Sequence, residues 1–109
     1  MLTHGHADHA RAGHGAVLGT AETLAILKAR YGEDAARSYQ TLRYGERVKL
    51  GEVTLWLAPA GHILGSAQAV LEYRGCRVVV SGDYKRQPDP TCAPFEPVPC
   101  AVFITEATF

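Results

Sequence analysis

Apolar residues in this 109-residue chain occur in short runs, and glycine, proline or charged residues separate one run from the next. Short apolar runs, either continuous or alternating with polar residues, are typical of β-strands. Two such runs flank the Arg74-Gly75 dipeptide, which predicts a β-hairpin. We expect strands at residues 16–18, 47–50, 53–58, 70–73, 76–80 and 101–105.

One helix is expected after the first of these strands. Leu24, Leu27 and Tyr31 recur at the spacing of one face of a helix. Thr20 suits the N-cap position, and Gly32 suits the position that follows the last helical residue. The pattern therefore predicts a helix between these two residues, and the chain combines a helix with strands.

The segment that connects the last two expected strands is rich in proline. Five of the six prolines of the chain lie within residues 87–99. Proline fixes φ and removes a backbone donor, so such a segment does not pair inside a sheet. We expect an irregular loop here.

Charge and composition exclude several classes of protein. Eleven basic residues balance eleven acidic ones, so the overall charge does not attract nucleic acid and any phosphate contact must be local. No stretch approaches the roughly 18 consecutive apolar residues of a membrane span, so no membrane partner is expected. Cys76, Cys92 and Cys100 form no C-x-x-C pair, which is typical of reduced thiols in a cytoplasmic protein.

The strongest chemical signal is a cluster near the start of the chain, where three histidines and one aspartate fall within six positions. Neutral imidazole and carboxylate groups are ligands that suit zinc. Alternate side chains of an extended backbone share one side, which favours two adjacent metal ions over one. The cluster consists of His4, His6, Asp8 and His9.

A solvated histidine-rich loop, or the remnant of an expression tag, would also contain such residues. Matching partners further along the chain argue against both alternatives. His62 is a lone histidine between glycines, and Asp83 closely follows the apolar run 78–80. Three separate pieces would have to coincide for a purely structural interpretation to hold.

These pieces resemble the metallo-β-lactamase fold, in which an H-x-H-x-D-H motif is followed by a single histidine and then by an aspartate that bridges two metals. The order and the residue types match at the initial cluster, at His62 and at Asp83. The G-H-x-x-G-S-A form, the S-G-D-Y-K-R form and the final I-T-E-A-T-F resemble the β-CASP branch, which contains nucleases. Within that branch the chain is most similar to bacterial ligase-associated DNA exonucleases, which are relatives of mRNA 3′-end-processing nucleases.

The resemblance implies a centre with two zinc ions, and manganese is the alternative metal. It assigns the first metal to His4, His6 and His62. It assigns Asp8 and His9 to the second metal, with Asp83 bridging both. Asp8 and Asp83 are the expected catalytic residues, and Asp8 is also suited to accept a proton from the attacking water.

Other residues carry weaker signals. The resemblance places Glu106 near the metals, although a glutamate at a strand end is equally suited to the surface. Ser66 offers a donor for a phosphate oxygen, with a plain turn as the alternative. Lys85 and Arg86 form the best local basic pair for a nucleic-acid backbone, and a solvated pair is the alternative. Trp56 alternates with leucines and is expected in the core rather than under a stacked base.

We interpret residues 1–109 as one partial metallo-β-lactamase domain of the α/β class. By resemblance, it is the middle portion of an αββα sandwich, without the strands that normally precede the histidine cluster and without the β-CASP cap. The chain is therefore expected to be an internal fragment of a longer protein. The isolated segment is expected to be inactive, because the second metal lacks its downstream histidine.

The favoured function is metal-dependent phosphodiester hydrolysis on nucleic acid, as a DNA exonuclease that is linked to ligase-dependent repair and to a DNA ligase. An RNA-processing nuclease of the same branch is the alternative, because contacts with the sugar would come from the cap. A hydrolase of thioesters or lactams fits less well with the G-S-A and E-A-T elements. A non-catalytic relative would be expected to lose ligands, and this segment keeps them.

Overall fold

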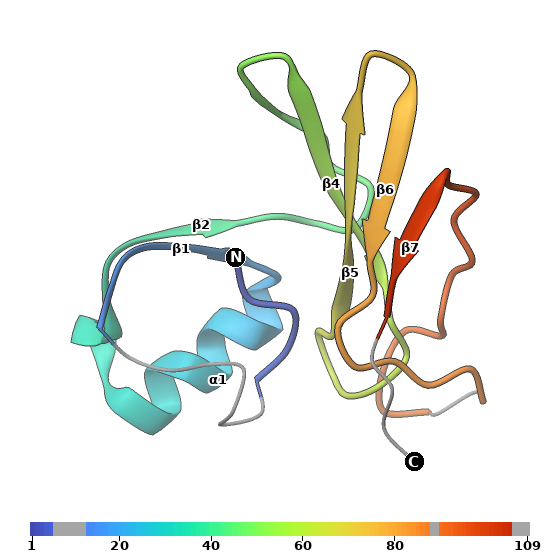
Figure 1. Ribbon diagram of the computed structural model, residues 1–109. Helices are drawn as coiled ribbons and strands as arrows, with labels where there is room; N and C mark the ends of the chain where they lie inside the picture. The colour runs from blue at the N-terminus through green and yellow to red at the C-terminus, as the bar shows by residue number, and fades with distance from the viewer. Residues whose placement is uncertain (6–12, 88–89, 106–109) are drawn as a thin grey trace.

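The computed structural model describes residues 1–5, 13–87 and 90–105. In this part of the chain, one α-helix and seven strands form an α/β unit with two sheets (Figure 1). The described helices include none that is long and apolar enough to cross a membrane. The elements are β1 (His14–Gly19), α1 (Ala21–Tyr31), a 3₁₀ turn η1 (Glu33–Ala35), β2 (Ala36–Thr41), β3 (Val48–Leu50), β4 (Val53–Pro59), β5 (Ala67–Tyr73), β6 (Cys76–Val80) and β7 (Val102–Ile104).

The smaller sheet pairs β1 and β2 in parallel, and helix α1 connects them. The helix begins after Thr20, whose side chain accepts a hydrogen bond from the amide of Thr23, and it ends before Gly32, which has a φ of 88°. The predicted strand, the helix and both of its caps are confirmed. The helix packs on the sheet through a core cluster of Leu2, Val17, Leu24, Leu27, Ala35 and Ala36.

The larger sheet has the strand order β3-β4-β5-β6-β7. Its strands are antiparallel, except that β6 and β7 run in parallel. Arg74 and Gly75 connect β5 to β6 with φ angles of 47° and 78°, so both turn residues are left-handed, as in the tight turns of hairpins. The predicted hairpin is confirmed, and β5 extends it back to Ala67.

Strand β4 lies inside the larger sheet and buries side chains on both of its faces. Trp56 and Ala58 belong to one core cluster. Leu57 belongs to a second cluster, with Leu42 and Ala67. Trp56 is 7% exposed, so its predicted position in the core is confirmed.

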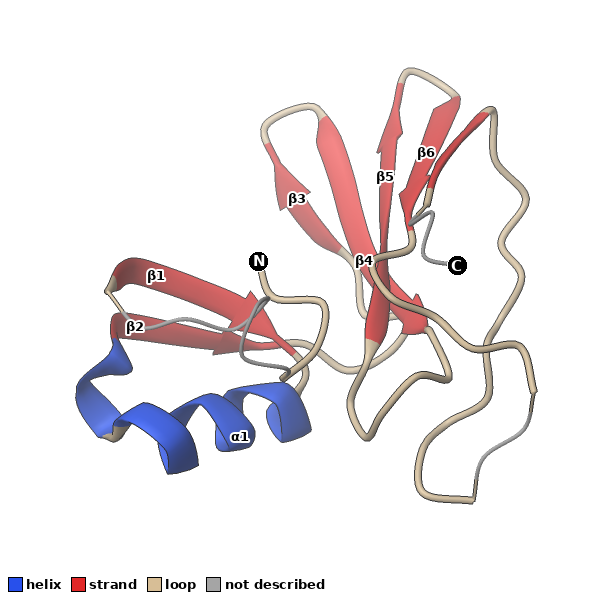
Figure 2. Cartoon of the chain, turned by 60° about the horizontal axis from the view of Figure 1, so that its bottom comes forward, coloured by secondary structure: helices blue, strands red, loops and turns tan. Residues whose placement is uncertain are grey.

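The N-terminal residues connect the two sheets. The amide of Leu2 donates a hydrogen bond of 2.8 Å to the carbonyl of Leu18 in β1. The carbonyl of Thr3 accepts one of 2.8 Å from the amide of Ala67 in β5. The next residue, His4, is therefore held where the smaller unit meets the beginning of β5, and the N-terminus lies between the two sheets in Figure 2.

Strand β2 is missing from the sequence-based expectation. Its six side chains follow a mostly exposed pattern, so no regular apolar face marks it in the sequence. The strand forms because it pairs with β1 along its length. The proline-rich loop is confirmed, since residues 81–87 and 90–101 contain neither helix nor strand.

Candidate metal centre

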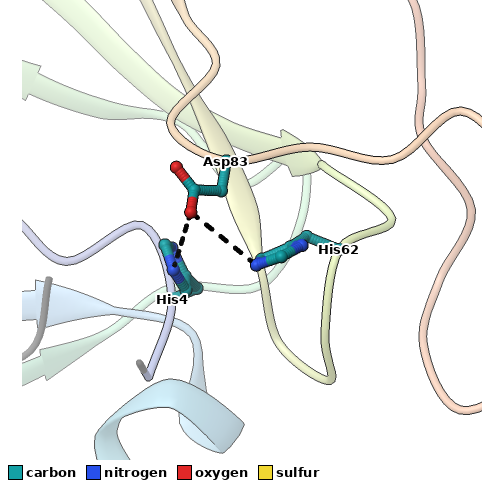
Figure 3. Close-up of side chains that lie close together, drawn as sticks. All are labelled: His4, His62 and Asp83. Carbon is teal, nitrogen blue, oxygen red and sulfur yellow. Dashed lines mark ion pairs between the residues drawn. The ribbon is translucent and has the colours of Figure 1, made fainter. Parts of the chain in front are cut away.

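Three of the predicted ligands come together from separate segments. His4 follows the N-terminal residues that pair with β1 and β5, His62 lies in the loop after β4, and Asp83 lies just after β6. Strands β4 and β6 both run antiparallel to β5. They are therefore parallel to each other, and their C-terminal ends lie at the same end of the sheet. Figure 3 shows the three side chains facing one another.

The distances between the three side chains suit a metal ion. The Oδ2 atom of Asp83 lies 3.6 Å from Nε2 of His4 and 3.8 Å from Nε2 of His62. Candidate ligand atoms of all three residues lie within 4.8 Å of one another. Two atoms that bind one tetrahedral zinc ion are about 3.4 Å apart, because each bond is about 2.1 Å long. Two imidazoles and a carboxylate at these separations fit a divalent cation.

Burial divides the centre into a closed and an open side. The side chain of His4 is 0% exposed, whereas those of His62 and Asp83 are 26% and 24% exposed. The two imidazole rings are nearly perpendicular, at 88°, and their centroids are 5.0 Å apart. The candidate centre is therefore shielded around His4 and open to solvent beside His62 and Asp83.

Thr3 contacts the second ring nitrogen of His4. Its Oγ1 lies 3.1 Å from Nδ1 of His4. In the tautomer whose Nε2 is available to a metal, Nδ1–H donates a hydrogen bond to Thr3, which fixes the orientation of the ring. A Cβ atom at Gly82 would lie 2.9 Å from Cβ of Thr3, so a glycine beside Asp83 leaves room for this contact.

Ser66 holds the loop that carries His62. Its Oγ accepts hydrogen bonds from the amides of His62, at 3.0 Å, and Ile63, at 3.3 Å. Ser66 is 1% exposed, so its hydroxyl faces the loop rather than solvent. The structure gives Ser66 a supporting contact to His62, and its role toward a phosphate stays a prediction.

Lys85 and Arg86 are exposed on the segment that follows Asp83. The amide of Lys85 donates a hydrogen bond of 3.0 Å to the carbonyl of Ala60, which ties this segment to the end of β4. Arg86 also lines a hollow of about 260 Å³ with Tyr84, and the three candidate ligands are not part of its lining. Contact of the two basic residues with phosphate stays a prediction.

The structure describes only some of the residues that the sequence predicts for this centre. Four predicted site residues lie outside the described residues: His6, Asp8, His9 and Glu106. Sequence reasoning missed the contact of Thr3 with His4, and it missed the hydrogen bonds that Thr23 and Tyr44 donate to the carbonyls of Gly65 and Ser66 in the loop of His62. The only signal for Thr3 is its position beside His4, and Thr23 and Tyr44 act through residues that are distant in the sequence.

Tyr44 supports the loop that carries His62, and the pKa of its phenol is raised. Its hydroxyl donates a hydrogen bond of 2.8 Å to the carbonyl of Ser66. Burial, and to a smaller extent the negative charges of Glu22 and Cys92, raise the pKa of Tyr44 from 10.0 to about 12. The neutral phenol therefore contributes stability that is complete below the unfolded-state pKa of 10.0 and is lost as the pH rises through about 12.

We expect the Tyr44→Phe variant to lose less stability than the wild type when the pH rises from about 9 to about 12, because phenylalanine has no proton to release. Denaturant unfolding of the full-length protein at several pH values in this range measures the difference. Parallel curves for Tyr44→Phe and the wild type would contradict the raised pKa.

Comparison with known proteins gives several relatives, and no family model matches the chain. The chain is 34% identical over 111 residues to a probable DNA ligase from Opitutus terrae, in a match that covers 100% of this chain and 11% of the ligase. It is 31% identical over 123 residues to a ribonuclease from Thermus thermophilus, covering 86% of this chain and 28% of the ribonuclease. It is 33% identical over 82 residues to endoribonuclease YSH1 from Candida glabrata, covering 71% of this chain and 11% of the endoribonuclease.

The chain thus spans between 11% and 28% of the length of these three relatives. Two of the three are named as nucleases, and the third is named as a ligase. The motifs at His4, His62 and Asp83 occur in this chain in the order that is typical of the metallo-β-lactamase fold. The matches and the motifs agree, and the chain belongs to the β-CASP branch of the metallo-β-lactamase fold hydrolases.

Proposed function

We propose that this chain forms the metal-binding part of a nuclease that hydrolyses phosphodiester bonds. The observation that carries the proposal is the approach of His4, His62 and Asp83 to within bonding reach of one cation. Residues 1–109 are, in this proposal, one partial metallo-β-lactamase domain from the middle of an αββα sandwich. The two sheets and the helix on the smaller one are compatible with that position.

The predicted ligands have distinct roles in the proposal. His4, His6 and His62 would hold a first metal, Asp8 and His9 would contribute to a second, and Asp83 would contribute to both. Two zinc ions, or manganese in their place, would supply Lewis-acid activation of a water molecule and would stabilise negative charge on a phosphate. Asp83 suits a shared position because each of its two carboxylate oxygens is able to face a different cation.

The protein groups around this centre position the reactants. Asp8 accepts a proton when water attacks the phosphorus atom. His4, buried and held by Thr3, keeps a fixed orientation and offers the same nitrogen throughout. Lys85 and Arg86 lie on the solvent-exposed segment after Asp83, where they attract the phosphates that flank the scissile bond.

We favour DNA as the substrate and exonuclease action linked to ligase-dependent repair, in a cytoplasmic protein that works with a DNA ligase. The match with a protein named as a DNA ligase, which extends over the whole chain, supports this choice. RNA processing is the second candidate, and the matches with two named ribonucleases support it.

The experiment that tests the function compares end-labelled single-stranded DNA and RNA of the same sequence with the purified full-length protein. We expect DNA to be shortened stepwise, activity to disappear after treatment with a chelator, and activity to return on addition of zinc or manganese. Faster cleavage of RNA would establish the second candidate instead. Hydrolysis of a thioester or a lactam without cleavage of either nucleic acid would overturn the proposal.

A further inference from the structure

The loop that carries His62 is held by side chains at the N-terminus of helix α1. The Oγ1 atoms of Thr20 and Thr23 donate hydrogen bonds to the carbonyl of Gly65, at 2.7 Å and 3.1 Å. Thr20 is 3% exposed and Thr23 is 0% exposed, so both hydrogen bonds are shielded from water. A carbonyl oxygen has two lone pairs and accepts both donors.

These contacts join parts of the molecule that are far apart in the chain. Thr20 lies 45 residues before Gly65, and Thr23 lies 42 residues before it. The threonines belong to the smaller unit, whereas His62 follows β4 of the larger sheet. The hydrogen bonds therefore fix the loop of His62 relative to helix α1.

Two further hydroxyl groups hold the other parts of the loop. Ser66 accepts hydrogen bonds from the amides of His62 and Ile63, and Tyr44 donates one to the carbonyl of Ser66. A loop of five residues, 62–66, is thus held by four side-chain hydroxyls from three segments of the chain. Such a set of contacts leaves the backbone at His62 little freedom to move.

We propose that Thr20 and Thr23 are positioning residues for His62, because they clamp the carbonyl of Gly65 and thereby hold the imidazole at the metal centre. This inference rests on the proposed metal site and assigns no contact between the threonines and the metal. Groups that orient metal ligands typically change metal affinity by 10–100-fold when they are removed. Helix α1 is therefore part of the support of the centre as well as part of the core.

The two threonines require different substitutions. Thr23→Val keeps the shape of the side chain and removes its donor, and Thr23→Ser keeps the donor. Thr20 is also the N-cap of helix α1, so its removal would weaken the helix for an unrelated reason. Thr20→Asp retains an N-cap acceptor, and its carboxylate has no proton to donate to Gly65. Thr54→Val, in strand β4, is the matched control for loss of a threonine hydroxyl.

The full-length protein and its variants are to be titrated with Zn²⁺ against a chromophoric chelator, and the absorption spectrum is to be recorded with Co²⁺ in place of Zn²⁺. We expect about tenfold weaker Zn²⁺ binding in Thr23→Val and in Thr20→Asp, and about 100-fold weaker binding in the double variant. The Co²⁺ spectrum should change in the same variants, because the position of an imidazole ligand alters the ligand field. Thr23→Ser and Thr54→Val should bind Zn²⁺ as the wild type does.

Three results would contradict the inference in distinguishable ways. Wild-type Zn²⁺ affinity in the double variant would show that the clamp does not position His62. Equal loss of Zn²⁺ affinity in Thr23→Ser, which keeps the hydroxyl donor, and in Thr23→Val, which lacks it, would show that the effect does not depend on the hydrogen bond to Gly65. A wild-type protein that binds no Zn²⁺ and cleaves no nucleic acid would overturn the proposed function itself, and the inference with it.

Discussion

Replacing Asp83 with asparagine is expected to abolish phosphodiester hydrolysis by the full-length protein and to leave its fold intact. The Oδ2 atom of this carboxylate lies 3.6 Å from Nε2 of His4 and 3.8 Å from Nε2 of His62. Asparagine keeps the shape of the side chain and removes the negative charge that attracts divalent cations. Lewis-acid stabilisation is worth several kcal/mol, so we expect the rate to fall by roughly a thousandfold or more.

This experiment separates loss of the centre from loss of the fold. Circular dichroism and thermal unfolding of Asp83→Asn should match those of the wild type, since the side chain is 24% exposed and the substitution preserves its volume. Asp34→Asn, in the exposed 3₁₀ turn, removes the same charge away from the centre and should retain full activity. Wild-type cleavage of both single-stranded DNA and RNA by Asp83→Asn would exclude Asp83 from the reaction.

Local signals were sufficient to predict the helix and most of the strands. Thr20 and Gly32 mark the ends of helix α1 because an N-cap hydroxyl and a left-handed glycine each satisfy backbone groups at a helix end. Arg74-Gly75 marks the hairpin of β5 and β6 because both residues adopt positive φ. Each of these features depends on residues that are close together in the chain, so it is predictable from the local sequence.

Pairing between distant segments was not predictable in the same way. Strand β2 is mostly exposed, and its formation depends on β1, which lies about twenty residues earlier. The parallel pairing of β6 with β7 joins strands that the long proline-rich segment separates. An apolar pattern identifies a candidate strand, but it does not identify the neighbour of that strand.

The candidate metal centre also combines features that the sequence shows with contacts between distant segments that only the fold shows. His62 and Asp83 were predicted as metal ligands because their motifs are specific, and the structure places them near His4, after the ends of β4 and β6. The supporting contacts of Thr23 and Tyr44 were missed because each hydrogen bond crosses more than twenty residues of sequence. Ligand types are visible in a sequence, whereas the groups that hold them in place become visible only in the fold.

Gly61→Ala is expected to destabilise the protein by about 3 kcal/mol and to weaken metal binding at the same time. Gly61 has a φ of 70°, which costs an L-residue about 1 kcal/mol. A Cβ atom there would also lie 2.5 Å from the carbonyl oxygen of Lys85 and 2.8 Å from the amide nitrogen of Phe95. Both atoms belong to the backbone of loops, so the loops themselves must shift, and overpacking of this kind adds about 2 kcal/mol.

The position of Gly61 connects this stability effect to the metal centre. Gly61 precedes His62, and the backbone that it touches at Lys85 lies two residues after Asp83. A methyl group between them would push the two candidate ligands apart, so zinc affinity should fall together with stability. Gly45→Ala is the matched control, because Gly45 has a φ of 81° and, apart from its own chain neighbours, no described residue has an atom within 4 Å of an added Cβ. Urea unfolding and zinc titration should show a loss of about 1 kcal/mol and unchanged affinity in this control. Equal losses of stability in the two variants would mean that close packing at Gly61 does not hold the segments of His62 and Asp83 together.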